Sequence, residues 1–231
     1  ILYIGTVLKQ AGFKVKLIDS VLDGHTIPEL VDLILKDKPL MVGVSAMTCQ
    51  VVNSLKIAQG VKAQDPTIFF AMGGSHVNST NGELFQFSDK FDFLVKGEGE
   101  PTFVELMQHI KHGREEFSKI SGIIYKNQGG EIVTTTPRGA IEDIDSIPFP
   151  DMSLIDYKRY DSFYAKSSPF TMMMASRGCP FSCTFCDAFA THGKKLRLRS
   201  PKNIVDEMEH HIKNFGISEF MIKDSTFTIR K

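Results

Sequence analysis

Short apolar runs alternate, in the first half of the chain, with segments whose apolar residues recur every three or four positions, and this alternation limits the possible folds most. The runs Leu40–Ala46, Thr67–Met72 and Phe91–Val95 have the length and hydrophobicity of strands buried on both faces. The segments between them have the periodicity of amphipathic helices. Strands that alternate with helices form a parallel sheet covered by helices. We therefore predict a doubly wound α/β domain over residues 1–119.

The N-terminal residues indicate that this α/β pattern begins part-way through. An apolar helical stripe ends at Gly12, a residue suited to a left-handed cap, and Val15–Asp19 has the pattern of a buried strand. Thr26 and Glu29 then form a capping box that starts the next helix. A parallel α/β sheet normally begins with a strand, which is central in the flavodoxin-like order 2-1-3-4-5. We therefore expect a first strand and its loop upstream of Ile1, without which both neighbouring strands have open edges.

The pattern changes after residue 119. Two short alternating strands, Ile123–Tyr125 and Ile132–Thr134, flank Asn127–Gly130 and predict a hairpin. The prolines within residues 147–150 then interrupt regular structure. We therefore assign residues 120–165 to a hairpin and a linker.

A second domain is predicted over residues 166–231. Its first strand, Phe170–Ala175, leads into a loop that contains three cysteines. Ser200 then caps a helix that has a proline at its first position, and Phe220–Ile222 forms the next strand. The core face of that helix is predicted to consist of Ile204, Val205, Met208, Ile212 and Phe215.

Composition excludes several classes of function. Lys plus Arg and Asp plus Glu both total 27, so no overall charge attracts nucleic acid or an anionic membrane. The longest strongly apolar run is too short to span a bilayer. Three of the four cysteines lie within eight residues, which suits a shared metal better than a secreted disulfide framework. We therefore expect a cytoplasmic protein in a reducing compartment.

The three clustered cysteines are the strongest sign of chemistry. Cys179, Cys183 and Cys186 have the spacing CxxxCxxC. Three thiolates on one loop can each ligate one iron of a cubane cluster and leave the fourth iron open for a ligand. A zinc site completed by a residue such as His192 is the alternative.

The loop Ser176–Cys186 resembles the cluster loop of the radical S-adenosylmethionine superfamily. The resemblance implies a 4Fe-4S cluster whose open iron binds the methionine part of S-adenosylmethionine, followed in the chain by the rest of a partial (β/α) barrel. It also implies that Phe185 lies beside the adenine. Asp224, Ser225 and Thr226 occupy the place after the second barrel strand that faces the methionine amino group. Ser225 departs from the two consecutive acids common there.

The first 119 residues resemble the flavodoxin- or Rossmann-like cobalamin-binding domain found upstream of many radical S-adenosylmethionine barrels. The likeness lies in the helix and strand of residues 1–19 and in the turns after the next three strands. Ligands of open α/β sheets bind at the carboxyl ends of the strands. The resemblance implies cobalamin contacts from Ser45, Met47, Thr48, Gly73, Gly74, Gly97, Glu98 and Gly99.

No cobalt ligand is assigned within the chain. Related cobalamin proteins carry a DxHxxG loop after the first strand, which here would precede Ile1. His25 follows the second predicted strand and is not assigned to cobalt, and His76 is expected to hydrogen-bond locally. Cys49 is expected to be a small buried side chain.

A short basic run precedes the last predicted helix. Lys194, Lys195, Arg197 and Arg199 are expected to form a solvated face. An arginine of this run could instead bind a carboxylate of a cofactor or substrate.

Together the two resemblances imply an enzyme that cleaves S-adenosylmethionine reductively and uses cobalamin to methylate or cyclise an unactivated carbon. They also imply a small-molecule substrate and an external electron donor such as flavodoxin or ferredoxin. The strands that would line the substrate pocket are expected beyond Lys231, so this chain alone is expected to be inactive. A methylthiotransferase-like radical enzyme without cobalamin and a zinc-stapled binding module are the alternatives.

Overall fold

The computed structural model describes residues 1–114 and 116–229, and the chain divides into two compact units. The first, here called the loop unit, consists of Ile1–Leu22 together with the chain from Ala140 onward. The second, here called the sheet unit, is Asp23–Gly139. The first helix thus belongs to the same unit as the cysteine loop and not to that of the sheet. The assignment of functional domains to residues 1–119, 120–165 and 166–231 stays a prediction.

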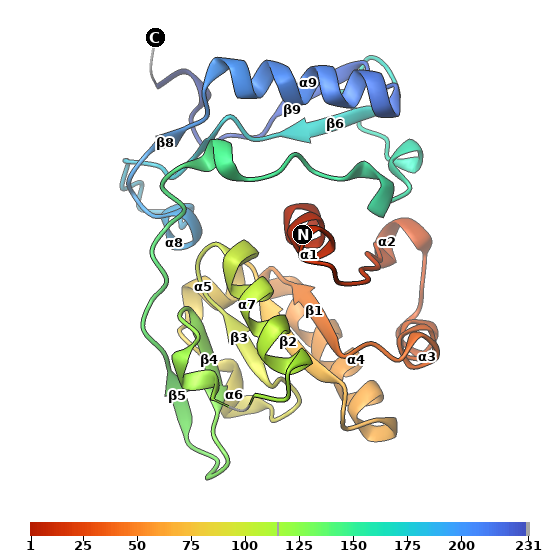
Figure 1. The fold of residues 1–231 in the computed structure, drawn as a ribbon, viewed down its shortest axis with the longest axis vertical. Coiled ribbons are helices and arrows are strands. Elements are labelled where there is room, and N and C mark those ends of the chain that lie inside the picture. Colours follow the sequence, from red (N-terminus) through yellow and green to blue (C-terminus); the bar gives the residue numbers. More distant parts are fainter. Residues whose placement is uncertain (115, 230–231) are drawn as a thin grey trace. The chain divides into compact units, whose positions relative to one another are not determined.

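The sheet unit is built on a five-stranded sheet with the order β1-β2-β3-β4-β5 (Figure 1). Its strands are β1 (Met41–Ser45), β2 (Phe69–Gly73), β3 (Phe93–Val95), β4 (Ile123–Lys126) and β5 (Ile132–Thr134). The first three strands are parallel, whereas β4 is antiparallel to both β3 and β5. The predicted parallel sheet is therefore confirmed for β1 to β3. The predicted hairpin is also confirmed, and it makes the sheet mixed.

Helices pack around this sheet and begin where local signals place them. They are α3 (Ile27–Asp37), α4 (Val51–Gln64), α5 (Ser75–Thr80), α6 (Leu84–Phe87) and α7 (Gly99–Lys111), with the short 3-10 helices η1 (Thr48–Gln50) and η2 (Phe117–Lys119). The Thr26 hydroxyl accepts a hydrogen bond from the Glu29 N–H, and the Glu29 carboxylate accepts one from the Thr26 N–H at 2.8 Å. The predicted capping box is therefore confirmed.

The two faces of the sheet carry different side chains, because side chains alternate along a strand. On one face Phe70, Met72 and Leu94 join the main hydrophobic core with residues of α3 and α4. On the other face the rings of Phe93 and Phe117 meet edge to face with centroids 4.8 Å apart. Each fully buried side chain of this size contributes about 1.5–3 kcal/mol to stability. Strands β2 and β3 are thus buried on both faces, as predicted. Strand β1 has no fully buried residue, so the predicted burial of Leu40–Ala46 on both faces is wrong except at Ala46.

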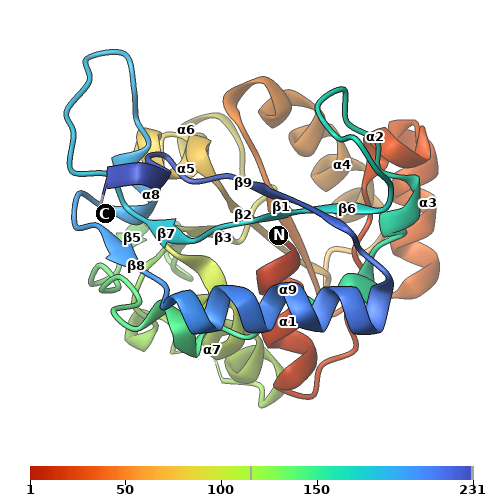
Figure 2. The same cartoon turned by 90° about the horizontal axis from the view of Figure 1, so that it is seen from above.

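The loop unit contains a strand–helix–strand motif and a small two-stranded stem. Its helices and strands are α1 (Leu2–Gln10), α2 (Ser20–Asp23), β6 (Phe170–Met173), β7 (Ser176–Arg177), α8 (Phe189–His192), β8 (Arg197–Leu198), α9 (Pro201–Phe215) and β9 (Glu219–Ile222). The short 3-10 helices are η3 (Ile144–Ser146), η4 (Met152–Leu154), η5 (Tyr157–Arg159) and η6 (Phe227–Ile229). Strands β6 and β9 are parallel neighbours joined through α9, which runs alongside them (Figures 1 and 2). Two parallel strands do not distinguish a barrel from an open sheet, so the predicted barrel stays a prediction. Among the described residues, no helix is long and apolar enough to cross a membrane.

The predicted strand Val15–Asp19 is wrong, because the structure has no strand there. The Leu17 side chain instead packs against α1, only 3.1 Å from the point where a Cβ on Gly5 would lie. The Asp19 carboxylate accepts a hydrogen bond from the Tyr160 hydroxyl at 2.9 Å. A strand needs a neighbouring strand to pair its backbone groups, and this segment packs against a helix and a loop. The predicted burial is also wrong, because Val15, Leu17, Ile18 and Asp19 are only partly buried and Lys16 is exposed.

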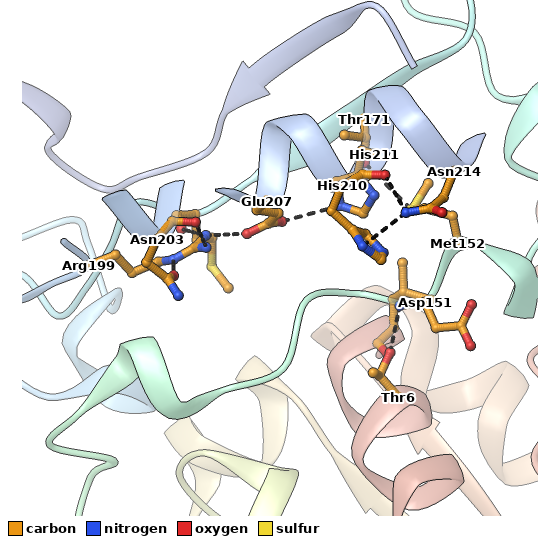
Figure 3. Close-up of polar contacts among 12 residues, drawn as sticks. Thr6, Asp151, Met152, Thr171, Arg199, Asn203, Glu207, His210, His211 and Asn214 are labelled. Atoms are coloured by element: carbon orange, nitrogen blue, oxygen red, sulfur yellow. Dashed lines mark hydrogen bonds and ion pairs between the residues drawn. The ribbon is translucent and has the colours of Figure 1, made fainter. Parts of the chain in front are cut away.

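Helix α1 is tied to η4 at Asp151. The Thr6 hydroxyl accepts a hydrogen bond from the Asp151 N–H at 2.9 Å (Figure 3). Lys9 Nζ lies 2.6 Å from Asp151 Oδ2. Burial raises the pKa of Asp151, but the hydrogen bonds from Lys9 and Ser153 outweigh it and hold that pKa below its ordinary value. The ionised form of Asp151 is therefore the one that the folded loop unit favours.

Helix α9 begins as predicted but buries an unexpected face. The Ser200 hydroxyl accepts a hydrogen bond from the Asn203 N–H at 3.1 Å, which confirms the predicted cap. The predicted core residues Val205 and Ile212 are each 51% exposed, so that assignment is wrong for them.

The residues that α9 buries most deeply are polar. Glu207 is 1% exposed and His211 is 0% exposed, and they form part of a chain of contacts (Figure 3). One Glu207 carboxylate oxygen pairs with Arg199 Nη1, and the other lies 3.4 Å from His211 Nε2. The positive charge of Arg199 offsets part of the free-energy cost of burying the Glu207 carboxylate. The side of α9 that faces inward is therefore the one that carries this buried ion pair.

Candidate functional site

The turns after β1 and β2 pack directly against each other in the sheet unit. The Ala46 N–H donates to the Gly73 carbonyl at 3.0 Å, and the His76 N–H donates to the Ala46 carbonyl at 3.2 Å. Gly74 has φ +96°, and a Cβ on it would lie 2.8 Å from both the nitrogen and the carbonyl oxygen of Ala46. A glycine is needed here because the chain's own neighbouring turn fills the space. The close approach thus serves the packing of the two turns.

Asn78, a residue that no sequence pattern singled out, joins the turn after β2 to the turn after β3. Its side-chain amide donates to the Gly74 carbonyl at 3.1 Å, and its side-chain oxygen accepts from the Gly97 N–H at 2.7 Å. Asn78 is 7% exposed. Its position four residues after Gly74 in a helical segment was the only available signal. Through Asn78 the three strand-end turns form one connected edge.

This edge presents exposed groups from η1 and the end of β1. Ser45, Met47 and Thr48 are all exposed, and the Thr48 hydroxyl lies 3.2 Å from His76 Nδ1. The predicted local hydrogen bond of His76 is therefore confirmed. Cys49 is also exposed, so its predicted burial is wrong, because η1 turns it outward from the sheet.

The turn after β3 is open on one side. Gly97 has φ +74°, and a Cβ there would meet no atom within 4 Å. Glu98 is 6% exposed and Gly99 begins α7. The same sheet edge thus offers open backbone at Gly97 and an exposed hydroxyl at Thr48, and a large ligand needs both space and hydrogen-bond partners. The sheet edge is therefore compatible with the predicted cobalamin, and the individual contacts stay predictions.

A two-stranded stem holds the ends of the cysteine loop in the loop unit. Strands β7 and β8 pair antiparallel, and the Cys179 N–H donates to the Gly193 carbonyl at 3.2 Å. Gly178 has φ +90°, and a Cβ on it would lie 2.2 Å from the Lys195 carbonyl oxygen. Any other residue at Gly178 would push the two sides of the stem apart.

The three predicted cluster ligands lie on this loop as free thiols. Cys183 and Cys186 are exposed and Cys179 is partly buried, with its Sγ 3.9 Å from the Thr226 hydroxyl oxygen. Across residues 1–114 and 116–229, no three His, Cys, Asp or Glu side chains lie together in an arrangement that could hold a metal ion. Thiolates are the donors that iron–sulfur clusters use, so the residue types fit such a cluster although their side chains are not gathered. The gathering of the three donors stays a prediction, as does the zinc alternative with His192.

The basic run before α9 divides into two solvated lysines and two buried arginines. Lys194 and Lys195 are exposed, as predicted. Arg197 is 5% exposed and donates to the Ile141 carbonyl at 2.6 Å, and Arg199 donates to the Met174 carbonyl at 3.0 Å. The predicted solvated face is therefore wrong for the arginines, because the guanidinium of each donates a hydrogen bond to a backbone carbonyl within the loop unit.

The residues predicted to contact S-adenosylmethionine differ in their exposure and hydrogen bonding. Phe185 is 92% exposed, and Ser225 is exposed after the end of β9. The carboxylate of Asp224 instead accepts hydrogen bonds from the Ala175 N–H and the Ser176 hydroxyl, each at 2.8 Å. The Asp224 side chain thus contacts the segment that leads into the cysteine loop.

Sequence comparison finds relatives over nearly the whole chain. Residues 1–107 match the family model described as the B12 binding domain. An uncharacterized methyltransferase, PH0819, of Pyrococcus horikoshii is 34% identical over 94% of this chain and 46% of its own length. The anaerobic magnesium-protoporphyrin IX monomethyl ester cyclase of Rubrivivax gelatinosus is 28% identical over 99% of this chain and 41% of its own length. The chain thus spans less than half the length of these two relatives.

A solved structure has the same fold. The cobalamin-dependent S-adenosylmethionine radical enzyme OxsB, solved with aqua-cobalamin and S-adenosylmethionine bound, matches with a TM-score of 0.78 at 21% identity. The match covers 98% of this chain and 31% of that protein. At this identity the likeness establishes the fold alone.

Proposed function

Because this chain carries a B12-binding domain and is related to the cobalamin-dependent radical S-adenosylmethionine enzymes, we propose that it is part of an enzyme that methylates or cyclises an unactivated carbon. The observation that carries the proposal is the presence of two features in one chain. One is the B12-binding match over residues 1–107, and the other is the loop with free thiols at Cys179, Cys183 and Cys186. The substrate is proposed to be a small molecule, and the electron donor an external flavodoxin or ferredoxin.

In this proposal the three cysteines hold a 4Fe-4S cluster at the mouth of the β7–β8 stem. A bound cluster supplies the electron for reductive cleavage of S-adenosylmethionine. The chain's own part is to present thiolates, and their exposure leaves them accessible for cluster assembly. Phe185 is proposed to cover the adenine, because an exposed ring of this kind can stack on a base. The backbone of Ser225 and Thr226 is proposed to face the methionine amino group.

The sheet edge is proposed to bind cobalamin. Exposed Ser45, Met47 and Thr48 offer two hydroxyls and a thioether, and open backbone at Gly97 gives a bulky ligand room to approach. Gly73, Gly74, Glu98 and Gly99 shape the turns around this edge. A bound cobalamin supplies methyl-transfer chemistry, and the residues named here bind and orient it.

The cluster is tested in the full protein purified and reconstituted without oxygen. We expect iron and sulfide in similar amounts and an electron paramagnetic resonance signal on reduction. Cys179→Ala should abolish that signal and S-adenosylmethionine cleavage, whereas Cys49→Ala should change neither, because Cys49 is an exposed thiol outside the loop. Zinc without iron or sulfide would contradict the radical chemistry and favour a zinc-stapled module.

Cobalamin binding is tested by the absorbance spectrum of retained corrinoid. Gly97→Asn should reduce retention, because asparagine tolerates positive φ but fills the open space beside Gly97. Gly113→Asn is the matched control, since Gly113 has φ +62° and equally open surroundings at the other end of α7. A wild-type protein that assembles its cluster but retains no corrinoid would overturn this half of the proposal and favour a methylthiotransferase-like enzyme.

A further inference from the structure

We infer that Asp224 is a positioning residue that orients the base of the cysteine loop, and that it acts through Ser176 and the backbone of Ala175. This inference rests on the proposed function, because it assigns a role relative to the cluster that the loop is proposed to hold. It differs from the expectation drawn from resemblance, in which the segment from Asp224 to Thr226 faces the methionine amino group directly.

The carboxylate of Asp224 holds two consecutive residues at once. One oxygen accepts from the Ala175 N–H and the other from the Ser176 hydroxyl, each at 2.8 Å. Both distances are ordinary hydrogen-bond lengths. Two bonds to adjacent residues restrict the rotation of the segment as well as its position, which one bond would not do.

This contact begins where the β6–β9 ladder ends. The last backbone bond of that ladder region runs from the Lys223 N–H to the Met173 carbonyl at 2.8 Å. Beyond it β6 leaves the sheet and continues into β7, so Ala175 and Ser176 have no strand neighbour on β9. The side chain of Asp224 therefore continues, by two further bonds, the attachment that the backbone ladder no longer provides.

Arg199 holds the same segment with the opposite hydrogen-bonding polarity. Its backbone N–H donates to the Ala175 carbonyl at 2.9 Å, and its guanidinium donates to the Met174 carbonyl at 3.0 Å. The guanidinium is in turn paired with buried Glu207 (Figure 3). Asp224 thus accepts hydrogen bonds from the segment, and Arg199 donates hydrogen bonds to its carbonyls. Both residues therefore fix the base of the loop.

The held segment leads directly to the first proposed cluster ligand. Ser176 lies three residues before Cys179, and Cys179 Sγ lies 3.9 Å from the hydroxyl oxygen of Thr226, two residues after Asp224. A rotation of the segment at Ser176 would therefore move Cys179 relative to the end of β9. The same end of β9 carries the backbone proposed to face S-adenosylmethionine.

Two substitutions separate positioning by hydrogen bonds from a direct charge contact. Asp224→Ala removes both bonds, whereas Asp224→Asn can keep both, because its oxygen accepts from Ala175 and its amide donates to the Ser176 hydroxyl oxygen. We expect Asp224→Ala to weaken S-adenosylmethionine binding to the reconstituted protein by about 10- to 100-fold, as loss of supporting contacts does at metal sites. Asp224→Asn should recover most of that loss.

Ser176→Ala provides a second, milder variant that removes one of the two bonds. We expect it to weaken S-adenosylmethionine binding in the same direction as Asp224→Ala but less. Both variants should also diminish the change that S-adenosylmethionine produces in the electron paramagnetic resonance spectrum of the reduced cluster. That signature reports the surroundings of the cluster, which a general loss of stability would leave unchanged in the folded fraction.

Glu219→Ala is the matched control, because Glu219 is also a carboxylate of β9 that accepts backbone hydrogen bonds. It receives the N–H groups of Lys166 and Ser167 at the opposite end of the strand, and these bonds hold its pKa below the ordinary value. We expect Glu219→Ala to leave the spectrum and S-adenosylmethionine binding unchanged.

The outcomes distinguish this inference from the proposed function. If Asp224→Ala or Ser176→Ala binds S-adenosylmethionine like the wild type, the positioning role is refuted while the cluster stands. If Asp224→Asn is as impaired as Asp224→Ala and Ser176→Ala is normal, Asp224 acts through its charge and the inference is wrong. If Asp224→Ala does not fold, Ser176→Ala and Asp224→Asn still decide it. A wild type without a cluster would instead overturn the proposed function.

Discussion

Replacement of Glu207 by alanine should destabilise the loop unit more than any other single truncation on α9. Glu207 and the side chain of Arg199 are 1% and 7% exposed, so their charges face each other with almost no water. Glu207 also lies 3.4 Å from His211 (Figure 3). Removing the carboxylate leaves the guanidinium buried without its counter-charge.

The expected loss follows from this burial. Ion pairs at the surface contribute at most about 1 kcal/mol, whereas removing one partner of a buried pair costs about 3–5 kcal/mol. We therefore expect Glu207→Ala to lower the free energy of unfolding by about 3–5 kcal/mol. Glu207→Gln keeps the volume and an amide oxygen facing Arg199, so its cost should be smaller, about 1–3 kcal/mol. The double variant Arg199→Met with Glu207→Leu should lose less than the sum of its single variants, because no charge is left alone.

Urea unfolding followed by circular dichroism measures these differences. Glu209→Ala is the control on the same helix, since Glu209 is 58% exposed and pairs with Lys213 at 3.1 Å. We expect the loss of such an exposed pair to cost at most about 0.5 kcal/mol. A Glu207→Ala protein no less stable than Glu209→Ala would refute the reasoning, because it would mean that Glu207 carries no buried charge.

The remaining predictions concern the sheet edge and the attachment of α1. Gly74→Ala should destabilise the protein by about 1–3 kcal/mol, because it adds positive-φ strain and a 2.8 Å contact with Ala46. Gly97→Ala should cost only the backbone strain, because its surroundings are open. Urea unfolding of the two variants compares these losses. The folded state lowers the pKa of Asp151 from 3.8, so its stabilisation is fully present above that value and is lost as pH falls through the lower folded pKa. Asp151→Asn should therefore remove, at neutral pH, at most about 1 kcal/mol from the partly exposed pair with Lys9, and should flatten the acid dependence of stability between about pH 2 and pH 5. An unchanged acid profile in Asp151→Asn would count against this assignment.

Features encoded by neighbouring residues were predictable from the sequence. The capping box of Thr26 and Glu29 and the cap at Ser200 involve residues three apart, so their chemistry is visible in the sequence. The β4–β5 hairpin was predictable for the same reason, because its turn chemistry lies between its strands. Short-range patterns therefore located the elements of the fold well.

Features that depend on distant partners were not predictable. The stripe containing Val205 and Ile212 indicated the wrong inward face of α9, because the pairing of Glu207 with Arg199 has no local signal. Arg197 and Arg199 alternate with Leu196 and Leu198, a pattern that predicts buried leucines and solvated arginines. The two arginines bond instead to the carbonyls of Ile141 and Met174, which lie far away in the sequence.

The sheet edge was predictable in outline only. Strand ends and glycines indicated where the turns meet, but Gly74 proved necessary for its contact with Ala46. Asn78 links the turns by bonds to Gly74 and Gly97, which are far apart in sequence from each other. The bond to Gly97 spans 19 residues, so Asn78 looks like any other polar helix residue until the fold brings that partner to it.

The short ladder between β7 and β8 also lowers the entropic cost of gathering metal donors. Bringing the ends of a flexible loop together costs free energy that grows slowly with its length. Here folding alone brings the two ends together, through the ladder, the bond from Cys179 to Gly193 and the tight approach of Gly178 to Lys195. The proposed cluster would then have to order only the interior of the loop.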